Sequence, residues 1–287
     1  MNIVVTGANG QLGSELKILA EQEIGHSYFF LERKSLPLDQ TLIIQDILGI
    51  YQPDLIIHCA AYTAVDKAEE EPELADAINH LATEEIAQYC RLNQTKLISI
   101  STDYVFDGSS RTPLGEDEFP APVNTYGLSK LKGEQAIQKW CPEGIIIRTS
   151  WVYSTFGNNF VKTMIRLMTE KEKISVINDQ IGSPTYAKDL AQAILDIIHS
   201  DSWVGGIYHY SGEGAISWYD FATSIRDACH LSCEITPIPS SQYPTPAKRP
   251  NYSLLDKSKI KSIFKVKVPY WEDSLLEMLN NLNTSES

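Results

Sequence analysis

The sequence predicts an α/β fold with a doubly wound parallel sheet of the Rossmann type and a smaller C-terminal α/β substrate lobe. Apolar strand-like runs alternate with helix-like segments from residue 2 to about residue 150, which is typical of a parallel sheet with helices on both faces. A glycine-rich turn, residues 7–13, follows the first run and precedes the first helix. We therefore expect an NAD(P)-binding domain over residues 1–150, with some later segments returning to it, and a mainly substrate-binding lobe over residues 151–287.

The first strand and its turn have the context of a dinucleotide site. Ile3-Val4-Val5 is a buried strand, and the helix after the turn carries leucines on one face. In such a loop Gly7 permits the tight turn, Gly10 lets the backbone approach a pyrophosphate, and Gly13 allows close packing of helix on strand. The helix N-terminus favours an anion through its free N–H groups and its dipole. The spacing is G-x-x-G-x-x-G, so the usual dinucleotide fingerprint is met only loosely.

The second strand predicts where the cofactor ribose binds. Tyr28-Phe29-Phe30-Leu31 leads into Glu32-Arg33-Lys34, and Glu32 stands 19 residues past Gly13. At this position an acid takes the ribose 2′-hydroxyl of NADH, whereas a base accommodates the 2′-phosphate of NADPH. Glu32 favours NADH, and the two basic residues favour NADPH. We expect NADPH, with NADH as the alternative; the competing interpretation of Arg33 and Lys34 is solvated loop charge.

The next strands bring further residues to the same edge of the sheet. Residues 54–58 run into Ala61-Tyr62-Thr63, and residues 96–100 deliver Ser101 and Thr102. Ligands of open parallel sheets bind beyond the carboxyl ends of the strands. We therefore expect the glycine turn, Ala61 to Thr63 and Thr102 to line one crevice.

The remaining pattern completes the predicted fold. Residues 145–147 indicate another buried strand, and residues 107–122 a surface loop. Ser217 to Asp220 is typical of a capping box that opens a helix. Prolines predict irregular structure over residues 238–246. The other predicted helices span residues 42–51, 73–91, 126–140, 159–168 and 189–198.

Tyr126 and Lys130 are the strongest catalytic candidates. They are four residues apart, which places both side chains on one face of a helix. An ammonium beside a phenol favours the phenolate and lowers the pKa of the tyrosine from about 10. Thr102 adds a hydroxyl that can hydrogen-bond a carbonyl. These three residues together predict a proton donor for a carbonyl that accepts hydride; the alternative is an ordinary exposed helix turn.

Bulk properties exclude several classes of protein. The net charge of −13 argues against nucleic acid, which selects for a basic face. No apolar run is long enough to span a bilayer, and Met1-Asn2 leads straight into a strand without a signal peptide. Five scattered cysteines suit a reducing compartment, so we expect a cytoplasmic protein. Cys229-His230-Leu231-Ser232-Cys233 is interpreted as a helix end rather than a metal site.

From Met1 to about residue 275 the chain resembles the extended short-chain dehydrogenase/reductases, and within them the members that reduce a dTDP-linked 4-keto sugar. The order and number of the matches make the resemblance specific. The matching segments are the glycine turn, residues 60–69, 101–106, 126–130, 148–153, 157–160, 178–185 and Arg249-Pro250.

The resemblance implies reduction of the C4 keto group of dTDP-4-dehydro-L-rhamnose by NAD(P)H, which gives dTDP-L-rhamnose and completes its biosynthesis. It implies that Tyr126 donates a proton to the C4 oxygen, that Lys130 bonds the nicotinamide ribose, and that Thr102 positions the carbonyl. It implies substrate contacts from Thr102, Asp103 and Trp151, although a core aromatic is the alternative for Trp151. The expected cofactor contacts are Gly7, Gly10, Gln11, Leu12, Gly13, Glu32, Arg33, Asp39, Gln40, Ala61, Tyr62, Thr63, Tyr126 and Lys130.

One position departs from the family. Some members are thought to dimerise around magnesium held by carboxylates, and Glu15 matches one of these carboxylates whereas Lys188 replaces another. Magnesium takes hard oxygen donors, so a lysine cannot ligate it. We expect no metal in the site and no magnesium requirement for the chemistry, while a homodimer without metal stays open.

Two classes of competing function remain. The first is another nucleotide-sugar enzyme on the same fold, either a different reductase, a dehydratase or an epimerase. A nucleotide-sugar 4,6-dehydratase carries an Asp-Glu pair after the threonine, whereas Asp103-Tyr104 follows Thr102 here. A 4-epimerase on the same fold would retain its cofactor through purification, so spectra of the purified protein distinguish it from a reductase. A non-catalytic NADP-binding regulatory subunit is the second alternative, and the presence of Thr102, Tyr126 and Lys130 argues for an enzyme.

Overall fold

The computed structural model describes residues 1–285 of the chain. Six strands form the central sheet: β1 (Asn2–Thr6), β2 (Ser27–Leu31), β3 (Leu55–His58), β4 (Lys96–Thr102), β5 (Ile145–Thr149) and β10 (Gly206–His209). The helices are α1 (Gln11–Ala20), α2 (Ile44–Tyr51), α3 (Val65–Ala68), α4 (Pro72–Asp76), α5 (Ala82–Asn93), α6 (Thr125–Trp140), α7 (Phe160–Glu170), α8 (Ala187–His199), α9 (Trp218–Ala228), α10 (Ser258–Phe264) and α11 (Trp271–Ser285).

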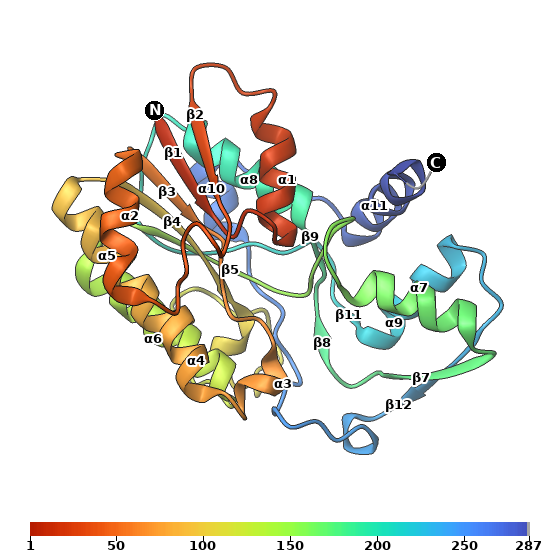
Figure 1. Cartoon of the computed structure of the whole chain (residues 1–287). Coiled ribbons are helices and arrows are strands. Elements are labelled where there is room, and N and C mark those ends of the chain that lie inside the picture. The colour runs from red at the N-terminus through yellow and green to blue at the C-terminus, as the bar shows by residue number, and fades with distance from the viewer. Residues whose placement is uncertain (286–287) are drawn as a thin grey trace.

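The central sheet confirms the predicted α/β class. Its strand order is β10-β5-β4-β3-β1-β2, and every neighbouring pair is parallel. The chain moves outward from β1 to β2 and then returns to the other side of β1 with β3. This reversal is the topological switch point at which open parallel sheets bind ligands. The glycine turn follows β1, and residues 59–63 follow β3, so both lie at this point (Figure 1).

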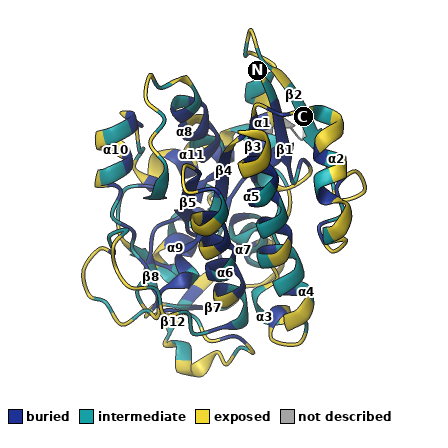
Figure 2. Ribbon diagram, turned by 90° about the vertical axis from the view of Figure 1, so that its left-hand side faces the viewer, coloured by how far each residue is buried: buried dark blue, intermediate teal, exposed yellow. Residues whose placement is uncertain are grey.

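Side chains alternate between two apolar cores on the two faces of the sheet. Ile3 and Val5 of β1 face one core with residues of α1, α8 and α10, whereas Val4 faces the other with residues of α2, α5 and α6. Strands buried on both faces read as continuous apolar runs, which is why the sequence indicated them. Figure 2 shows the buried strands as a dark core between helices whose outer sides are exposed.

The second half of the chain builds a third core beside the sheet. It contains α7, α9 and α11 together with the parallel pair β7 (Lys173–Ile177) and β12 (Glu234–Ile238). Four shorter strands form two further pairs, β6 (Val152–Tyr153) with β9 (Thr185–Tyr186) and β8 (Ile181–Gly182) with β11 (Ile216–Ser217). Within residues 1–285, none of the helices is both long and apolar enough to cross a membrane.

Most of the predicted elements are present, with adjustments. The Ser217–Asp220 capping box is confirmed at the start of α9, and α9 ends at Ala228, so the helix end predicted at Cys229 is confirmed. The single helix predicted over residues 73–91 is instead α4, a π-helical turn at Ala77–Leu81, and α5. Strand β4 continues through Thr102 rather than ending at Ile100.

Candidate active site

The glycine turn fits an anionic ligand at the start of α1. Gly7 has φ of +72°, and a Cβ there would lie 2.8 Å from the backbone nitrogen of Ala60. A Cβ on Gly13 would lie only 2.2 Å from the Gly7 carbonyl oxygen, so both positions require glycine. Gly10 is the N-cap of α1 and supplies no capping side chain, which leaves first-turn N–H groups without intrahelical acceptors. Uncapped N–H groups at a helix start suit a diphosphate.

Tyr126 and Thr102 come together from different elements. Tyr126 is the second residue of α6, and Thr102 is the last residue of β4. Burial raises the pKa of Tyr126 to about 12, and a hydrogen bond with Thr102 opposes this shift. A phenol with this pKa stays protonated at neutral pH, which is the form that a proton donor requires.

Lys130 lies one turn further along α6, but it does not act on Tyr126 as we predicted. Its Nζ donates to the Ile100 carbonyl at 2.7 Å, and burial lowers the pKa of Lys130 to about 8. The prediction that the lysine lowers the pKa of Tyr126 is therefore wrong for this structure, because burial of the phenol and the nearby Asp103 carboxylate both raise that pKa, and Lys130 does not contribute to it. The ammonium has three donors, and only one of them is used on Ile100.

A buried ion pair lies one further turn along α6. Glu134 and Arg148 are each 2% exposed, and Arg148 Nη2 lies 2.7 Å from Glu134 Oε2. Ser101 Oγ donates to Glu134 Oε1 at 2.5 Å, which ties the pair to the end of β4. Glu134 also raises the pKa of Lys130 against the effect of burial. This pair therefore supports both the strand and the lysine of the candidate site.

Asp103 follows Thr102 and is buried with one oxygen free. Its Oδ1 accepts from Thr102 Oγ1 at 3.1 Å, and the Ser253 hydroxyl is close enough to lower the pKa of the carboxyl. The buried Oδ2 makes no hydrogen bond of good geometry with the described residues. Burial raises the pKa of Asp103 to about 6. A buried acceptor without a partner beside the proton donor suits a substrate hydroxyl.

Trp151 stands between the two halves of the chain in a strained conformation. Its φ is +48°, an uncommon region for a bulky residue. Its ring stacks on Trp218 with centroids 3.6 Å apart, and a Cβ on Gly182 would lie 3.0 Å from Cε2 and Cζ2 of the same ring. The indole is thus packed against Trp218 and Gly182. The residue as a whole is partly exposed and packs against the third core, so the core-aromatic interpretation stays open beside the predicted substrate contact.

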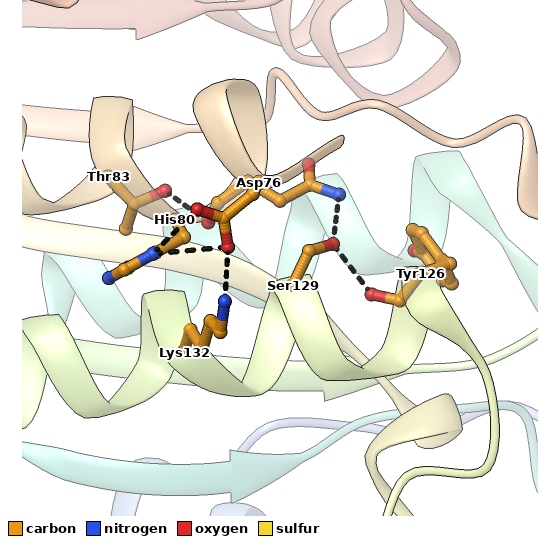
Figure 3. Close-up of polar contacts among 7 residues, drawn as sticks. Asp76, His80, Thr83, Tyr126, Ser129 and Lys132 are labelled. Atoms are coloured by element: carbon orange, nitrogen blue, oxygen red, sulfur yellow. Dashed lines mark hydrogen bonds and ion pairs between the residues drawn. The ribbon is translucent and has the colours of Figure 1, made fainter. Parts of the chain in front are cut away.

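The loop after β3 is supported by Asn79 on the π-helical turn. Asn79 accepts from the Tyr62 N–H at 2.8 Å and donates to the Tyr62 carbonyl at 3.0 Å. It also donates to Ser129 Oγ at 3.0 Å, and Ser129 Oγ donates to the Tyr126 carbonyl at 2.8 Å. Figure 3 shows Ser129 beside Tyr126 on one helix, with Lys132 directed at Asp76. Asn79 therefore supports both the predicted nicotinamide wall and the helix that carries Tyr126.

Most of the predicted cofactor residues in the glycine turn and after β2 contact other side chains or backbone groups of the chain. Glu32 accepts from Asn9 at 2.6 Å, and the largely exposed Arg33 pairs with Asp39 at 3.3 Å. Gln40 is exposed. Gln11 donates to the Val152 carbonyl at 3.3 Å, so its side chain reaches the second half of the chain.

The carboxylates and histidines that could bind a metal lie away from Tyr126 and Thr102, and the lysine that replaces a carboxylate of the family is already paired. Lys188 Nζ contacts Glu277 Oε1 at 2.5 Å, and Glu15 accepts from Ser154 at 2.6 Å. Within residues 1–285, Glu23, His26 and His199 form one group that could hold a metal ion. His26 precedes β2, so this group lies at the amino ends of the strands and contacts no residue of the candidate site.

The sequence did not assign roles to several residues of the site. Asn124 stands directly before α6 and caps it, and an asparagine before a helix is a recognisable cap signal. Asp66 and Arg249 lie in segments that carried the resemblance, but their pairing spans 183 residues. Asn79 and Trp218 showed no local pattern, because their roles depend on long-range packing.

Comparisons with known proteins agree with this geometry. Residues 1–284 match the family described as the RmlD substrate binding domain. The chain is 39% identical to dTDP-4-dehydrorhamnose reductase of Escherichia coli K12, over 99% of each chain. It superposes on a dTDP-4-dehydrorhamnose reductase of Clostridium acetobutylicum with a TM-score of 0.94 at 36% identity, covering 99% and 100% of the two chains. The reductase of Bacillus anthracis in complex with NADP gives 0.91 at 39% identity, covering 98% and 99%.

Proposed function

The chain belongs to the RmlD substrate binding domain family, and we propose on that basis that it reduces the C4 keto group of dTDP-4-dehydro-L-rhamnose with NADPH. The product is dTDP-L-rhamnose. The observation that carries this proposal is the meeting of Tyr126 and Thr102 at the carboxyl end of β4, next to a glycine turn that suits a diphosphate. Relatives that match over 99% of each chain are dTDP-4-dehydrorhamnose reductases, and the reductase of Bacillus anthracis is in complex with NADP.

The reaction needs a hydride at C4 of the sugar and a proton on its O4. Bound NADPH supplies the hydride. Tyr126 delivers the proton from its phenol, which its raised pKa keeps protonated. Thr102 holds the carbonyl oxygen beside that phenol through its hydroxyl. Lys130 keeps its charge near the site with the support of Glu134, and its unused donors face the ribose of the cofactor in this proposal.

The sugar is held from both halves of the chain. The free Oδ2 of Asp103 accepts from a sugar hydroxyl, and the exposed part of Trp151 limits where the sugar ring lies. In this proposal residues 1–150, with the later segments that return to the sheet, bind the cofactor, and the remainder of residues 151–287 mainly binds the substrate. The returning segments are β10, α8 and α10. The cysteines are all free, which supports a reducing, cytoplasmic location. We also propose a homodimer without a bridging metal, since Lys188 is already paired with Glu277.

Replacing the proton donor tests the proposal. Tyr126→Phe removes the phenolic hydroxyl and keeps the ring that packs edge-on against Tyr104. General acid catalysis contributes about 10²–10⁴-fold, so kcat with the keto sugar should fall by that factor while the Kd of NADPH stays near the wild-type value. Leu128→Ala, an exposed position on the same helix, is the control. Wild-type turnover by the Phe variant would refute the assignment of Tyr126.

A further inference from the structure

We infer that Asn124 is a positioning residue for this reaction: it locks the helix turn that carries Tyr126 to residues 247–250, and so sets the proton donor relative to the substrate half of the chain. The inference rests on the proposed function, because it concerns the placement of the proton donor. Residues 247–250 lie between β12 and α10, and Figure 1 shows this part of the chain in blue passing beside α3.

Asn124 uses both ends of its amide in a buried position. Its Oδ1 accepts from the Gly127 N–H at 2.7 Å and caps α6. Its Nδ2 donates to the Lys248 carbonyl at 2.8 Å, across 124 residues of sequence. The side chain is 8% exposed. A helix cap needs only an acceptor, which aspartate or serine provides equally well. The amide therefore serves a second purpose, which is the bond to residues 247–250.

A forked ion pair fixes the same segment from α3. Arg249 Nη2 donates to Asp66 Oδ2 at 2.7 Å, and Nη1 donates to Oδ1 at 3.0 Å. The Ala247 N–H donates to the same carboxylate at 3.2 Å. Two parallel bonds of this kind give directional as well as energetic specificity. The hydrogen bond from Arg249 also lowers the pKa of Asp66, so the pair stays charged at neutral pH.

The helix start is fixed to the end of α3 as well. Glu69 accepts from the Thr125 N–H at 2.8 Å and from Thr125 Oγ1 at 2.9 Å. Thr125 directly precedes Tyr126. Three segments therefore meet at one junction, which we call the 124 junction and define as residues 66–69, 124–125 and 247–249. One of them carries the start of the catalytic helix, and one comes from the second half of the chain.

The 124 junction has little room to shift. A Cβ on Gly127 would lie 2.1 Å from the Tyr104 carbonyl oxygen, so the first turn of α6 is pressed against the chain that follows Thr102. Gly108 has φ of +82°, and a Cβ there would lie 2.5 Å from the Asn251 nitrogen. The chain after residue 250 is thus packed on the same stretch. A change at the Lys248 carbonyl is therefore passed directly to Tyr126 and Thr102.

Asn124→Asp separates the two functions of the side chain. The carboxylate keeps the shape and the helix cap, which it strengthens through the helix dipole. It loses the donor and places an oxygen against the Lys248 carbonyl. We expect the KM for dTDP-4-dehydro-L-rhamnose to rise and kcat to fall, with kcat/KM reduced at least tenfold. The Kd of NADPH and the Tm should stay near wild-type values. Amide hydrogen exchange of residues 247–251 should accelerate.

Two companion variants make the test decisive. Lys248→Ala removes only an exposed side chain and keeps the carbonyl, so it should behave as wild type. Asp66→Asn breaks the ion pair from the other side and should also raise the KM, which keeps the inference testable if Asn124→Asp does not fold. A wild-type kcat/KM and wild-type exchange in both Asn124→Asp and Asp66→Asn would overturn it, as would a lowered Tm with an unchanged KM. If wild type itself does not turn over the sugar, the proposed function fails, and the exchange rates still test the 124 junction.

Discussion

Glu134→Gln should destabilise the protein strongly and shift its activity on the pH axis. The substitution preserves the shape of the side chain and removes its charge, leaving the Arg148 guanidinium at 2% exposure without its anion. The other polar side-chain contact of Arg148, His209 at 3.5 Å, cannot replace the carboxylate. Burial and then Arg148 lower the pKa of His209 to about 3, so that ring is neutral at pH 7.

The magnitude follows from the burial of the pair. Removing one partner of a buried ion pair costs about 3–5 kcal/mol. For a chain of this size each kcal/mol lowers the Tm by roughly 2–4 °C, so a decrease of at least about 6 °C is expected. Glu134 also raises the pKa of Lys130, which lies at about 8. Removing the anion lowers that pKa, so activity at alkaline pH should be lost at a lower pH than in wild type.

The assay is urea unfolding at pH 7 together with the pH profile of kcat/KM. Glu170→Gln is the matched control, because Glu170 pairs with Arg166 at the surface with side chains 53% and 61% exposed. Exposed pairs of this kind contribute about 0.3–0.5 kcal/mol. The reasoning would be refuted if Glu134→Gln lowered the free energy of unfolding by less than about 1 kcal/mol. It would also be refuted if kcat/KM of the variant decreased at the same alkaline pH as that of wild type.

Three other predictions concern cofactor choice, metal and pH. Arg33→Ala should raise the Kd of NADPH about tenfold and leave the Kd of NADH unchanged. A tenfold change is close to the lower end of the roughly 1.5–3 kcal/mol that a hydrogen bond to a charged group contributes. Equal losses of affinity for both cofactors in binding titrations would exclude a contact of Arg33 with the 2′-phosphate. Treatment with EDTA should leave initial rates unchanged, and a large loss that magnesium restores would contradict this. The pH profile of wild-type kcat/KM should fall above about pH 8 as Lys130 loses its proton, and below about pH 6 as Asp103 gains one. A flat profile between pH 5 and 9 would show that neither group matters.

The sequence predicted the strands and the glycine turn of residues 1–150 well, because their signals are local. A buried parallel strand is a continuous apolar run, and the turn at Gly7 needs a residue that tolerates positive φ. The convergence of the glycine turn, the segment after β3 and Thr102 followed from one general rule of parallel sheets. The observed register of β1, β3 and β4 places their carboxyl ends side by side, as that rule requires.

The prediction was weaker wherever the outcome depends on a balance between burial and charge. The four-residue spacing correctly placed Tyr126 and Lys130 on one helix, but it could not show that Lys130 turns to the Ile100 carbonyl. Burial of the phenol then decides its pKa. The 124 junction was equally hidden, because the bonds between its three segments join residues 56 to 183 positions apart. Such contacts have no periodic pattern in the sequence.

The most direct test of the proposed reaction follows one hydrogen atom. Purified protein is mixed with dTDP-4-dehydro-L-rhamnose and NADPH that carries deuterium at both positions of nicotinamide C4, and the sugar product is analysed by mass spectrometry and NMR. A keto-sugar reductase predicts dTDP-L-rhamnose with one deuterium, located at C4, and one NADP⁺ formed for each sugar reduced. NADPH that binds and is not consumed, or product that carries no deuterium at C4, would contradict the account.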